Sequence, residues 1–283
     1  MELEAYQSRW SLTNPVQLAE TPTSALYRVR RADGGAAVLK ILTELGRADE
    51  AAGAPWLDYI DGDGAVNLLA HDDGAHLLEY LGGATLVPMV AAGDDAGATA
   101  IVVDVVKKLH GPKNKSVPVG LPTLRERFRA LFDRRDDTSF FSRGAQLAET
   151  LLNSQSEIRS LHGDLHHLNI LHGPRGWCAI DPKGILGDPH YELAALFGNP
   201  HGMPHLTDDP ARACAMVAQC AQALGLDSGR ILAFAAAQSA LSAAWNLMDG
   251  LDPAHDFALG RVLFGLIDAP AAHKAGRNYG RSL

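Results

Sequence analysis

Residues 161–171 read LHGDLHHLNIL and residues 177–184 read WCAIDPKG, and these two stretches decide how the rest of the chain is interpreted. Within them, Asn169 lies five positions after Asp164, and Asp181 lies twelve positions after Asn169. The apolar residues 177–180 predict a short strand that ends at Asp181. One loop and one strand end therefore carry two carboxylates and one amide at defined spacing.

This set of side chains is what phosphoryl transfer from a nucleoside triphosphate requires. Mg²⁺ takes oxygen ligands and usually keeps several waters, so one carboxylate and one amide suffice, and we expect them to be Asp181 and Asn169. A further carboxylate, Asp164, would orient the acceptor hydroxyl and take its proton. The order His-x-Asp, four residues, Asn and a later Asp is that of the kinase catalytic loop.

The same pattern predicts two partners upstream, a lysine on the third strand and a glutamate that holds it. Lys40 lies in the apolar segment 37–41, where a buried cation needs a charged partner. Glu50 is the first candidate for that partner and Glu44 is the second. The alternative is that Lys40 is a surface lysine on an edge strand.

Hydrophobic periodicity predicts a small antiparallel sheet followed by a larger helical part, which is an α+β fold. Strands are expected at 16–19, 25–30, 36–42, 66–70 and 76–80, with a helix from about Arg47. Turn residues at 32–35 and 72–74 predict two hairpins, of 25–30 with 36–42 and of 66–70 with 76–80. Two groups of apolar residues then have helical spacing and predict helices. The first is Ile101, Val105 and Leu109, and the second is Leu147, Leu151, Ile158 and Leu161. Residues 111–122 read as a loop, and 228–250 as a buried helix.

Composition argues against several other classes of function. With 33 acidic and 25 basic residues the net charge is −8, so we expect no nucleic-acid partner and interpret the arginines at 125–135 as a solvated helix face. The chain lacks an apolar run of about 18 residues and a secretory signal, which predicts no membrane partner and a cytoplasmic location. An acidic protein suits a cationic or polar small-molecule acceptor. We expect a monomer or a dimer.

The histidines of the first stretch suggest a metal site as an alternative. His162 and His166 are four positions apart, as in a helical zinc site, but Gly163 stands where that site has its general base. We therefore expect the histidines to pack and orient the loop.

These residues resemble the catalytic motif of the aminoglycoside phosphotransferase family. The stretch LHGDLHH at 161–167 is most similar to the branch that contains streptomycin 6-phosphotransferases and hydroxyurea phosphotransferases. The strand that ends in Ile-Asp-Pro at 180–182 and the run LSAAWN at 241–246 are also similar. Likeness at 78–80 and 124–128 extends the resemblance over nearly the whole chain.

The resemblance implies a protein-kinase-like bilobal fold that uses ATP and Mg²⁺. The nucleotide-binding lobe would span 1–81, and the catalytic and acceptor-binding lobe 82–283. Asp164 carries over as the catalytic base, Asn169 and Asp181 as metal ligands, and Lys40 with Glu50 as the phosphate-contacting pair. The resemblance also implies that Asp188, His190 and Glu192 stabilise the catalytic loop. Glu79, Tyr80 and Leu81 would form the hinge that meets the adenine, and Thr23 and Ser24 would replace a glycine-rich phosphate loop. Acceptor contacts are predicted at His167, Asn246 and Asp249, whereas Trp245 is assigned to the core.

The sequence therefore predicts an ATP- and Mg²⁺-dependent O-phosphotransferase that acts on a small-molecule hydroxyl, with streptomycin-like and hydroxyurea-like acceptors first. Leu168 and Lys183 depart from the pattern of the branch, which is compatible with a different acceptor. The alternatives are a kinase of an unrelated metabolite, a pseudokinase-like nucleotide-binding regulator, and a histidine-ligated metal hydrolase.

Overall fold

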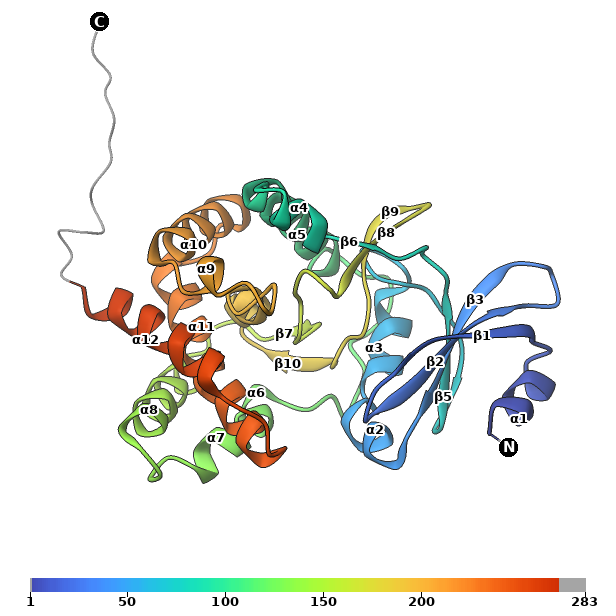
Figure 1. Cartoon of the computed structure of the whole chain (residues 1–283), viewed down its shortest axis with the longest axis horizontal. Coiled ribbons are helices and arrows are strands. Elements are labelled where there is room, and N and C mark those ends of the chain that lie inside the picture. Colours follow the sequence, from blue (N-terminus) through green and yellow to red (C-terminus); the bar gives the residue numbers. More distant parts are fainter. Residues whose placement is uncertain (1, 270–283) are drawn as a thin grey trace, which may run out of the picture.

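The N-terminal part of the protein is a five-stranded antiparallel sheet, seen at the right of Figure 1. The structure, a computed structural model, describes residues 2–269. Its strands run in the order β1-β2-β3-β5-β4. Their bounds are β1 (Thr13–Glu20), β2 (Ser24–Arg30), β3 (Ala36–Leu42), β4 (Leu68–Asp72) and β5 (Ala75–Glu79). Both predicted hairpins are confirmed.

The two faces of β3 are divided between packing and chemistry. Ala37, Leu39 and Ile41 are buried in a small cluster with Leu12 and Leu77, beside helix α1 (Glu2–Arg9). Because side chains alternate along a strand, Lys40 points to the opposite face. There it is paired in register with Leu26 on β2 and His76 on β5, in the middle of the sheet.

The helix expected from about Arg47 begins earlier, at Glu44. Thr43 caps α2 (Glu44–Asp49) by accepting a hydrogen bond from the Gly46 backbone at 3.1 Å, and this cap explains the earlier start. Glu50 is the residue at its C-terminal end. A further helix, α3 (Gly53–Ile60), follows and buries Trp56 in the large core of the C-terminal part.

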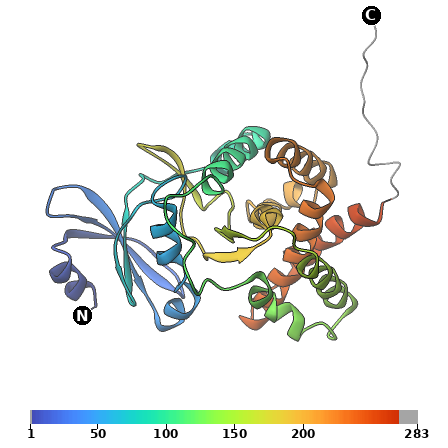
Figure 2. The same ribbon diagram turned by 180° about the vertical axis from the view of Figure 1, so that it is seen from behind.

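The C-terminal part is mainly helical, and the two views of Figures 1 and 2 show its helices around the short strands that carry the motif. Its helices are α4 (Val87–Ala91), α5 (Asp95–Leu109), α6 (Leu124–Arg127), α7 (Arg129–Asp133), α8 (Ser139–Asn153), η1 (Pro189–Leu196), α9 (Pro204–Thr207), α10 (Pro210–Leu224), α11 (Ser228–Met248) and α12 (Ala254–Asp268). Its strands are β6 (Ala84–Thr85), β7 (Arg159–Leu161), β8 (Ile170–Gly173), β9 (Gly176–Ala179) and β10 (Ile185–Gly187). The expected α+β fold, a small antiparallel sheet followed by a larger helical part, is confirmed.

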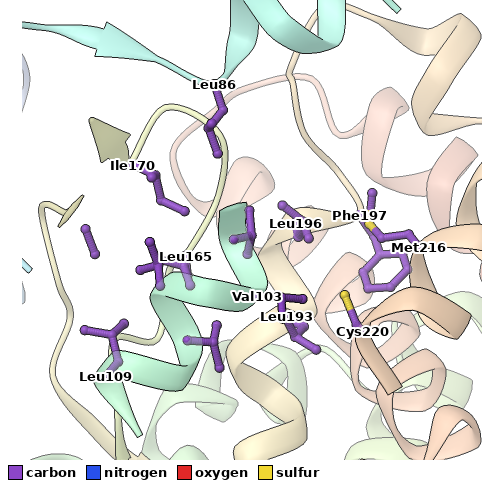
Figure 3. Packing of buried hydrophobic residues seen from close by; sticks show 14 of the residues in the cluster. Leu86, Val103, Leu109, Leu165, Ile170, Leu193, Leu196, Phe197, Met216 and Cys220 are labelled. Carbon is purple, nitrogen blue, oxygen red and sulfur yellow. The ribbon is translucent and has the colours of Figure 1, made fainter. Parts of the chain in front are cut away.

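Leu165 and Ile170 anchor the motif in the main hydrophobic core. Figure 3 shows both side chains with Val103 and Leu109 of α5 and Leu193 of η1. All five are at most 2% exposed, so each contributes about 1.5–3 kcal/mol by leaving water. The loop between Leu165 and Ile170 is therefore held at both ends by burial.

The expected helical continuation through Ile158 and Leu161 is wrong. Helix α8 ends at Asn153, where the Ser154 hydroxyl donates to the carbonyl oxygens of Thr150 at 2.8 Å and Leu151 at 3.2 Å. A serine that bonds the preceding turn competes with the helical backbone. Leu161 instead pairs with Ile185 across β7 and β10, which brings the chain directly to the motif.

Helix α11 is long and apolar enough to cross a membrane by length and composition alone. However, 67% of its most apolar window is buried inside the protein. It packs against α8, α12 and η1, as expected for the central helix of a core. The predicted buried helix at 228–250 is confirmed, and so is the loop expected at 111–122.

Candidate active site

The loop that follows β7 is held by a single buried carboxylate. Glu192 on η1 accepts hydrogen bonds from the backbone N–H groups of His162 and Gly163, both at 3.0 Å, and contacts His110 Nε2 at 3.0 Å. Burial raises the pKa of Glu192, but the His110 hydrogen bond and charge outweigh it, so the pKa lies below its usual value. The expectation that Glu192 stabilises the loop is confirmed.

Asp188 and His190 have a different role from the one expected. The Asp188 carboxylate accepts hydrogen bonds from His190 Nδ1 at 2.5 Å and Arg230 Nε at 2.7 Å. Arg230 also donates to the Leu151 carbonyl at 2.9 Å. These contacts join η1 to α11 and α8 rather than to the loop.

Asn169 closes the loop onto Asp164. Its side-chain Nδ2 donates to the Asp164 backbone carbonyl at 2.9 Å, and its backbone carbonyl accepts from the Ile180 backbone N–H at 2.9 Å. The Asp164 side chain is 29% exposed, and His166 Nε2 lies 3.8 Å from Asp164 Oδ2. The Asn169 side chain is thus held against the backbone of Asp164.

Lys40 is bound between two carboxylates. It forms ion pairs with Glu50 and with Asp181, and both Lys40 and Glu50 are buried. The predicted pairing of Lys40 with Glu50 is therefore confirmed, and the second candidate, Glu44, is exposed. A buried ammonium between carboxylates is the arrangement that a lysine needs inside an apolar strand.

Asp181 follows the end of β9 at Ala179, and its side chain reaches Lys40. Its φ is +60°, a left-handed conformation that is uncommon outside glycine, and its side chain is 40% exposed. Burial raises the pKa of this carboxyl, but the charge and hydrogen bond of Lys40 outweigh it and keep the pKa low. Asp181 is thus an anion at neutral pH.

The donor set fits Mg²⁺ bound together with phosphates. The Lys40 ammonium already lies beside Asp181 as a bound cation would, and the Asn169 amide oxygen and the Asp181 carboxylate would supply the hard oxygen atoms that this ion prefers. Across residues 2–269 there is no group of three or more His, Cys, Asp or Glu side chains able to hold a metal. His162 contacts the Ile180 carbonyl oxygen through Nε2 at 2.8 Å and accepts from the Asp164 backbone N–H through Nδ1 at 3.2 Å, so both of its ring nitrogens are engaged within the loop.

The turn between β1 and β2 is fixed to the start of α2. Thr43 donates from its backbone N–H to the Thr23 carbonyl at 2.9 Å and from its hydroxyl to the Pro22 carbonyl at 2.8 Å. Residue 46 must be glycine, because a Cβ there would lie 1.9 Å from the Thr23 oxygen. Ser24 is buried, with its backbone N–H on the Thr21 hydroxyl at 3.0 Å. The turn is ordered without a glycine-rich loop.

The predicted hinge follows β5. Glu79 accepts from Arg175 Nη2 at 2.5 Å and Asn67 Nδ2 at 2.9 Å, so its side chain joins the sheet to β8 and β9. Leu81 is buried in the main core, and the Tyr80 hydroxyl donates to the Gly82 carbonyl at 3.4 Å. Contact with a nucleotide base through the backbone of residues 79–81 stays a prediction.

A cavity of about 480 Å³ opens beside Asp164, and we call it the acceptor cavity. Thr23 and Leu45 line it from the N-terminal part. Its charged side chains are Arg127, Asp164, Lys183, Asp249 and Asp256, and its other lining residues include His166, Asn199, His201, Gln238, Ser239, Ser242, Trp245 and His255. This volume lies within the range of about 300–1,000 Å³ that is typical of small-molecule sites.

The three predicted acceptor contacts differ in position. Asp249 lines the cavity, and Asn246 contacts it indirectly by donating to the lining carboxylate of Asp256 at 2.6 Å. The prediction that His167 contacts the acceptor is wrong, because this residue is 0% exposed and does not line the cavity. Burial lowers the pKa of His167 to about 4, and neither ring nitrogen has a hydrogen-bond partner within the described chain.

Two residues of the cavity were misassigned from the sequence. Arg127 was interpreted as part of a solvated helix face, and Trp245 as a core residue. In the structure the Arg127 guanidinium lies 4.8 Å from the centre of the Trp245 ring, and both line the cavity. The alternation of charges around Arg127 hid it, since that pattern is typical of exposed helices.

Comparison with known proteins agrees with this geometry. Residues 9–250 match a family model described as aminoglycoside/hydroxyurea antibiotic resistance kinase. Streptomycin 3''-kinase of Klebsiella pneumoniae is 36% identical over 248 residues, covering 86% of this chain and 91% of that enzyme. Streptomycin 6-kinase of Streptomyces griseus is 29% identical over 86% of this chain and 81% of that enzyme. Hydroxyurea phosphotransferase of Kitasatospora aureofaciens is 32% identical over 69% of this chain and 59% of that enzyme.

Solved structures with the same fold are more distant in sequence. A choline/ethanolamine kinase family protein from Mesorhizobium loti superimposes with a TM-score of 0.65 at 16% identity, over 97% of both chains. A thermostable mutant of aminoglycoside phosphotransferase APH(4)-Ia, in complex with ADP and hygromycin B, gives 0.62 at 17% identity, over 97% of this chain and 99% of that one. At these identities the likeness shows the fold alone.

Proposed function

This chain belongs to the family of aminoglycoside and hydroxyurea antibiotic resistance kinases and is a small-molecule O-phosphotransferase, and we propose that it phosphorylates streptomycin at the 3'' hydroxyl with ATP and Mg²⁺. The observation that carries the proposal is the acceptor cavity, which joins Asp164 to two further carboxylates. Identity of 36% to a streptomycin 3''-kinase, against 29% to a 6-kinase, supports the 3'' position.

The size of the cavity supports a large acceptor. Its volume of about 480 Å³ suits a drug-sized molecule, since small-molecule sites run from about 300 to 1,000 Å³. Hydroxyurea has only a few non-hydrogen atoms and would leave most of that space filled with solvent. A polycationic aminoglycoside would fill it and bring its cations to Asp249 and Asp256.

Asp256 supports a cationic acceptor most directly. It is 5% exposed, and its Oδ2 accepts a hydrogen bond from Asn246 Nδ2. A buried carboxylate is costly unless it meets a cation or several donors. An ammonium or guanidinium group of the acceptor would meet that need.

In the proposed reaction Asp164 holds the acceptor hydroxyl and takes its proton. The hydroxyl oxygen bonds to the γ-phosphorus while the bond from that phosphorus to the β–γ bridging oxygen breaks, and its electron pair leaves with ADP. Lys40 would contact the phosphates while Glu50 holds it in place. Mg²⁺, bound by Asn169 and Asp181, would neutralise the charge on the phosphates. Positioning and charge neutralisation supply most of the rate in such transfers.

The test is ADP release with ATP and Mg²⁺ over a panel headed by streptomycin and hydroxyurea. Streptomycin-dependent release, lost in Asp164→Ala and Asp181→Ala, is expected. Asp252→Ala is the matched control, because Asp252 is an exposed carboxylate near the cavity residues. NMR of the product would identify the phosphorylated hydroxyl. Release with hydroxyurea alone, or full activity in Asp164→Ala, would contradict the proposal.

A further inference from the structure

The hairpin of β8 and β9 carries both proposed metal ligands at its open end. Asn169 is the residue before β8, and Asp181 comes shortly after β9. Arg175 lies at the closed end, in the turn between the two strands. A change in the orientation of this hairpin would therefore move both ligands together.

Arg175 uses all of its guanidinium nitrogens on groups outside the hairpin. Its Nη1 donates to the Gly62 carbonyl at 2.6 Å, and its Nη2 donates to the Ala65 carbonyl at 3.0 Å. Its Nε and Nη2 donate to the two carboxylate oxygens of Glu79, at 3.1 and 2.5 Å. Burial raises the pKa of Glu79, but the Arg175 hydrogen bond outweighs it and keeps the pKa below its usual value. Because the guanidinium is a planar fork, this two-point pair fixes orientation as well as distance.

The groups that Arg175 holds lie on two connections between the five-stranded sheet and the helical part. Residues 62–67 lead to β4 from α3, whose Trp56 is in the main core. Residues 80–83 lead from Glu79, at the end of β5, to β6. The Glu79 backbone N–H also donates to the Asn67 carbonyl at 3.0 Å, so the two connections are bonded to each other. Arg175 thus binds both connections at once.

The second connection returns to the same hairpin, because β6 pairs with β8 (Figure 1). Between β5 and β6 it contains Gly82 and Gly83, at φ of +106° and +112°, which are conformations that only glycine adopts readily. The backbone of this segment therefore resists rotation weakly. Arg175 joins the residue before it to the hairpin that pairs with the strand after it, so rotation of the sheet against the hairpin would break the contacts of Arg175.

Phosphoryl transfer requires groups on both sides of these connections to meet the same phosphates. Lys40 lies on the sheet, whereas Asn169 and Asp181 lie beside the hairpin. A misplacement of about 1 Å can lower the rate about 100-fold. We propose that Arg175 is a positioning residue, which holds the hairpin with its two metal ligands in a fixed orientation to the sheet that carries Lys40. This inference rests on the proposed function, because it uses the roles proposed there for these residues.

Kinetics of Arg175→Gln, with Arg143→Gln as the matched control, test the proposal. Arg143 also joins distant segments, by donating to Asp268 at 2.6 Å and to the Phe264 carbonyl at 3.4 Å, and its side chain is 42% exposed against 37% for Arg175. Each variant is assayed well below its unfolding temperature.

Arg175→Gln should lower kcat by about 10- to 100-fold with the acceptor KM unchanged, because the acceptor cavity keeps its shape while the phosphates are misaligned. Arg175→Lys should recover part of kcat, since it keeps a positive charge opposite Glu79. Wild-type kcat in Arg175→Gln would overturn the inference, and so would an equal loss of kcat in Arg143→Gln.

Hydrogen–deuterium exchange separates this inference from the proposed acceptor, because it needs no turnover. With ADP and Mg²⁺ present, peptides that cover residues 62–67 and 79–85 should exchange faster in Arg175→Gln than in wild type, whereas peptides of α11 should not change. Arg143→Gln should match wild type in both segments. Unchanged exchange of both segments in Arg175→Gln would overturn the inference. Faster exchange there without turnover of streptomycin would leave it standing and reject only the acceptor.

Discussion

The strongest structural prediction concerns Glu192. Replacing it with Gln keeps the size of the side chain but removes the charge and turns one accepting oxygen into a donor. That donor would face a backbone N–H or His110, all of which contact the carboxylate at 3.0 Å. A hydrogen bond to a charged group contributes about 1.5–3 kcal/mol, and an unsatisfied buried donor costs about 1–3 kcal/mol. The expected loss of unfolding free energy is therefore about 3–5 kcal/mol.

Urea unfolding at pH 7, with a check that two spectroscopic probes give the same transition, measures this loss. Glu149→Gln is the matched control, because its carboxylate is 40% exposed and pairs with Arg125 on the surface, where such a pair contributes about 0–1 kcal/mol. We also expect Glu192→Gln to lower kcat, because His162 and Gly163 lead directly into Asp164. A loss below about 1 kcal/mol, or a stable variant with full kcat, would refute this account of Glu192.

The same variant has a pH signature. Because the folded pKa of Glu192 lies below its usual 4.5, its stabilisation is present above pH 4.5 and is lost as pH falls through the folded pKa. The gap between wild type and Glu192→Gln should therefore shrink below about pH 4.5. A gap that stays constant into acid would show that the charge of Glu192 is not what stabilises the loop.

Three other predictions follow from single contacts. Lys40→Met leaves Glu50 buried without its cation and should lower the free energy of unfolding in urea by about 3–5 kcal/mol. The double variant Lys40→Met with Glu50→Gln should regain most of that stability but release no ADP. Equal stability of the single and double variants would contradict this. Gly163→Ala places a Cβ 2.8 Å from Ile185 Cδ1 at φ +81°, so it should lower both stability and kcat. Gly176→Ala is the control, because its φ is +88° but its Cβ would meet open space, and it should cost only about 1–2 kcal/mol of stability with normal kcat. His167→Leu should keep full activity. Because folding lowers the pKa of His167 from 6.5 to about 4, wild type loses stability as the pH falls from 6.5 to 4, and the variant should lose less. A large fall in kcat would restore His167 as an acceptor contact.

Patterns that depend on neighbours in the chain were predictable from the sequence. Period-two alternation at 25–30, turn residues at 32–35 and the apolar segment at 36–42 predicted the hairpin of β2 and β3, because these patterns involve only neighbouring residues. The spacing of Asp164, Asn169 and Asp181 predicted the loop and strand end that carry them. Glu50 was identified because a buried lysine requires a partner nearby.

The misassigned parts depended on segments far apart in the chain. Residues 158 and 161 have helical spacing with α8, but Leu161 pairs with Ile185, and that pairing outweighs a local preference. His167 follows two motif residues that reach the cavity, yet the core buries it completely.

The catalytic loop was thus predictable from the sequence alone, since Asp164 and Asn169 lie within a few residues of each other. The acceptor cavity was decided by the tertiary structure. It is formed by Arg127 of α6, Trp245 and Asp249 at the end of α11, and Asp256 of α12, with Asp164 beside them. Helix packing alone brings these residues together, and neither spacing nor composition encodes which side of a helix will face the cavity.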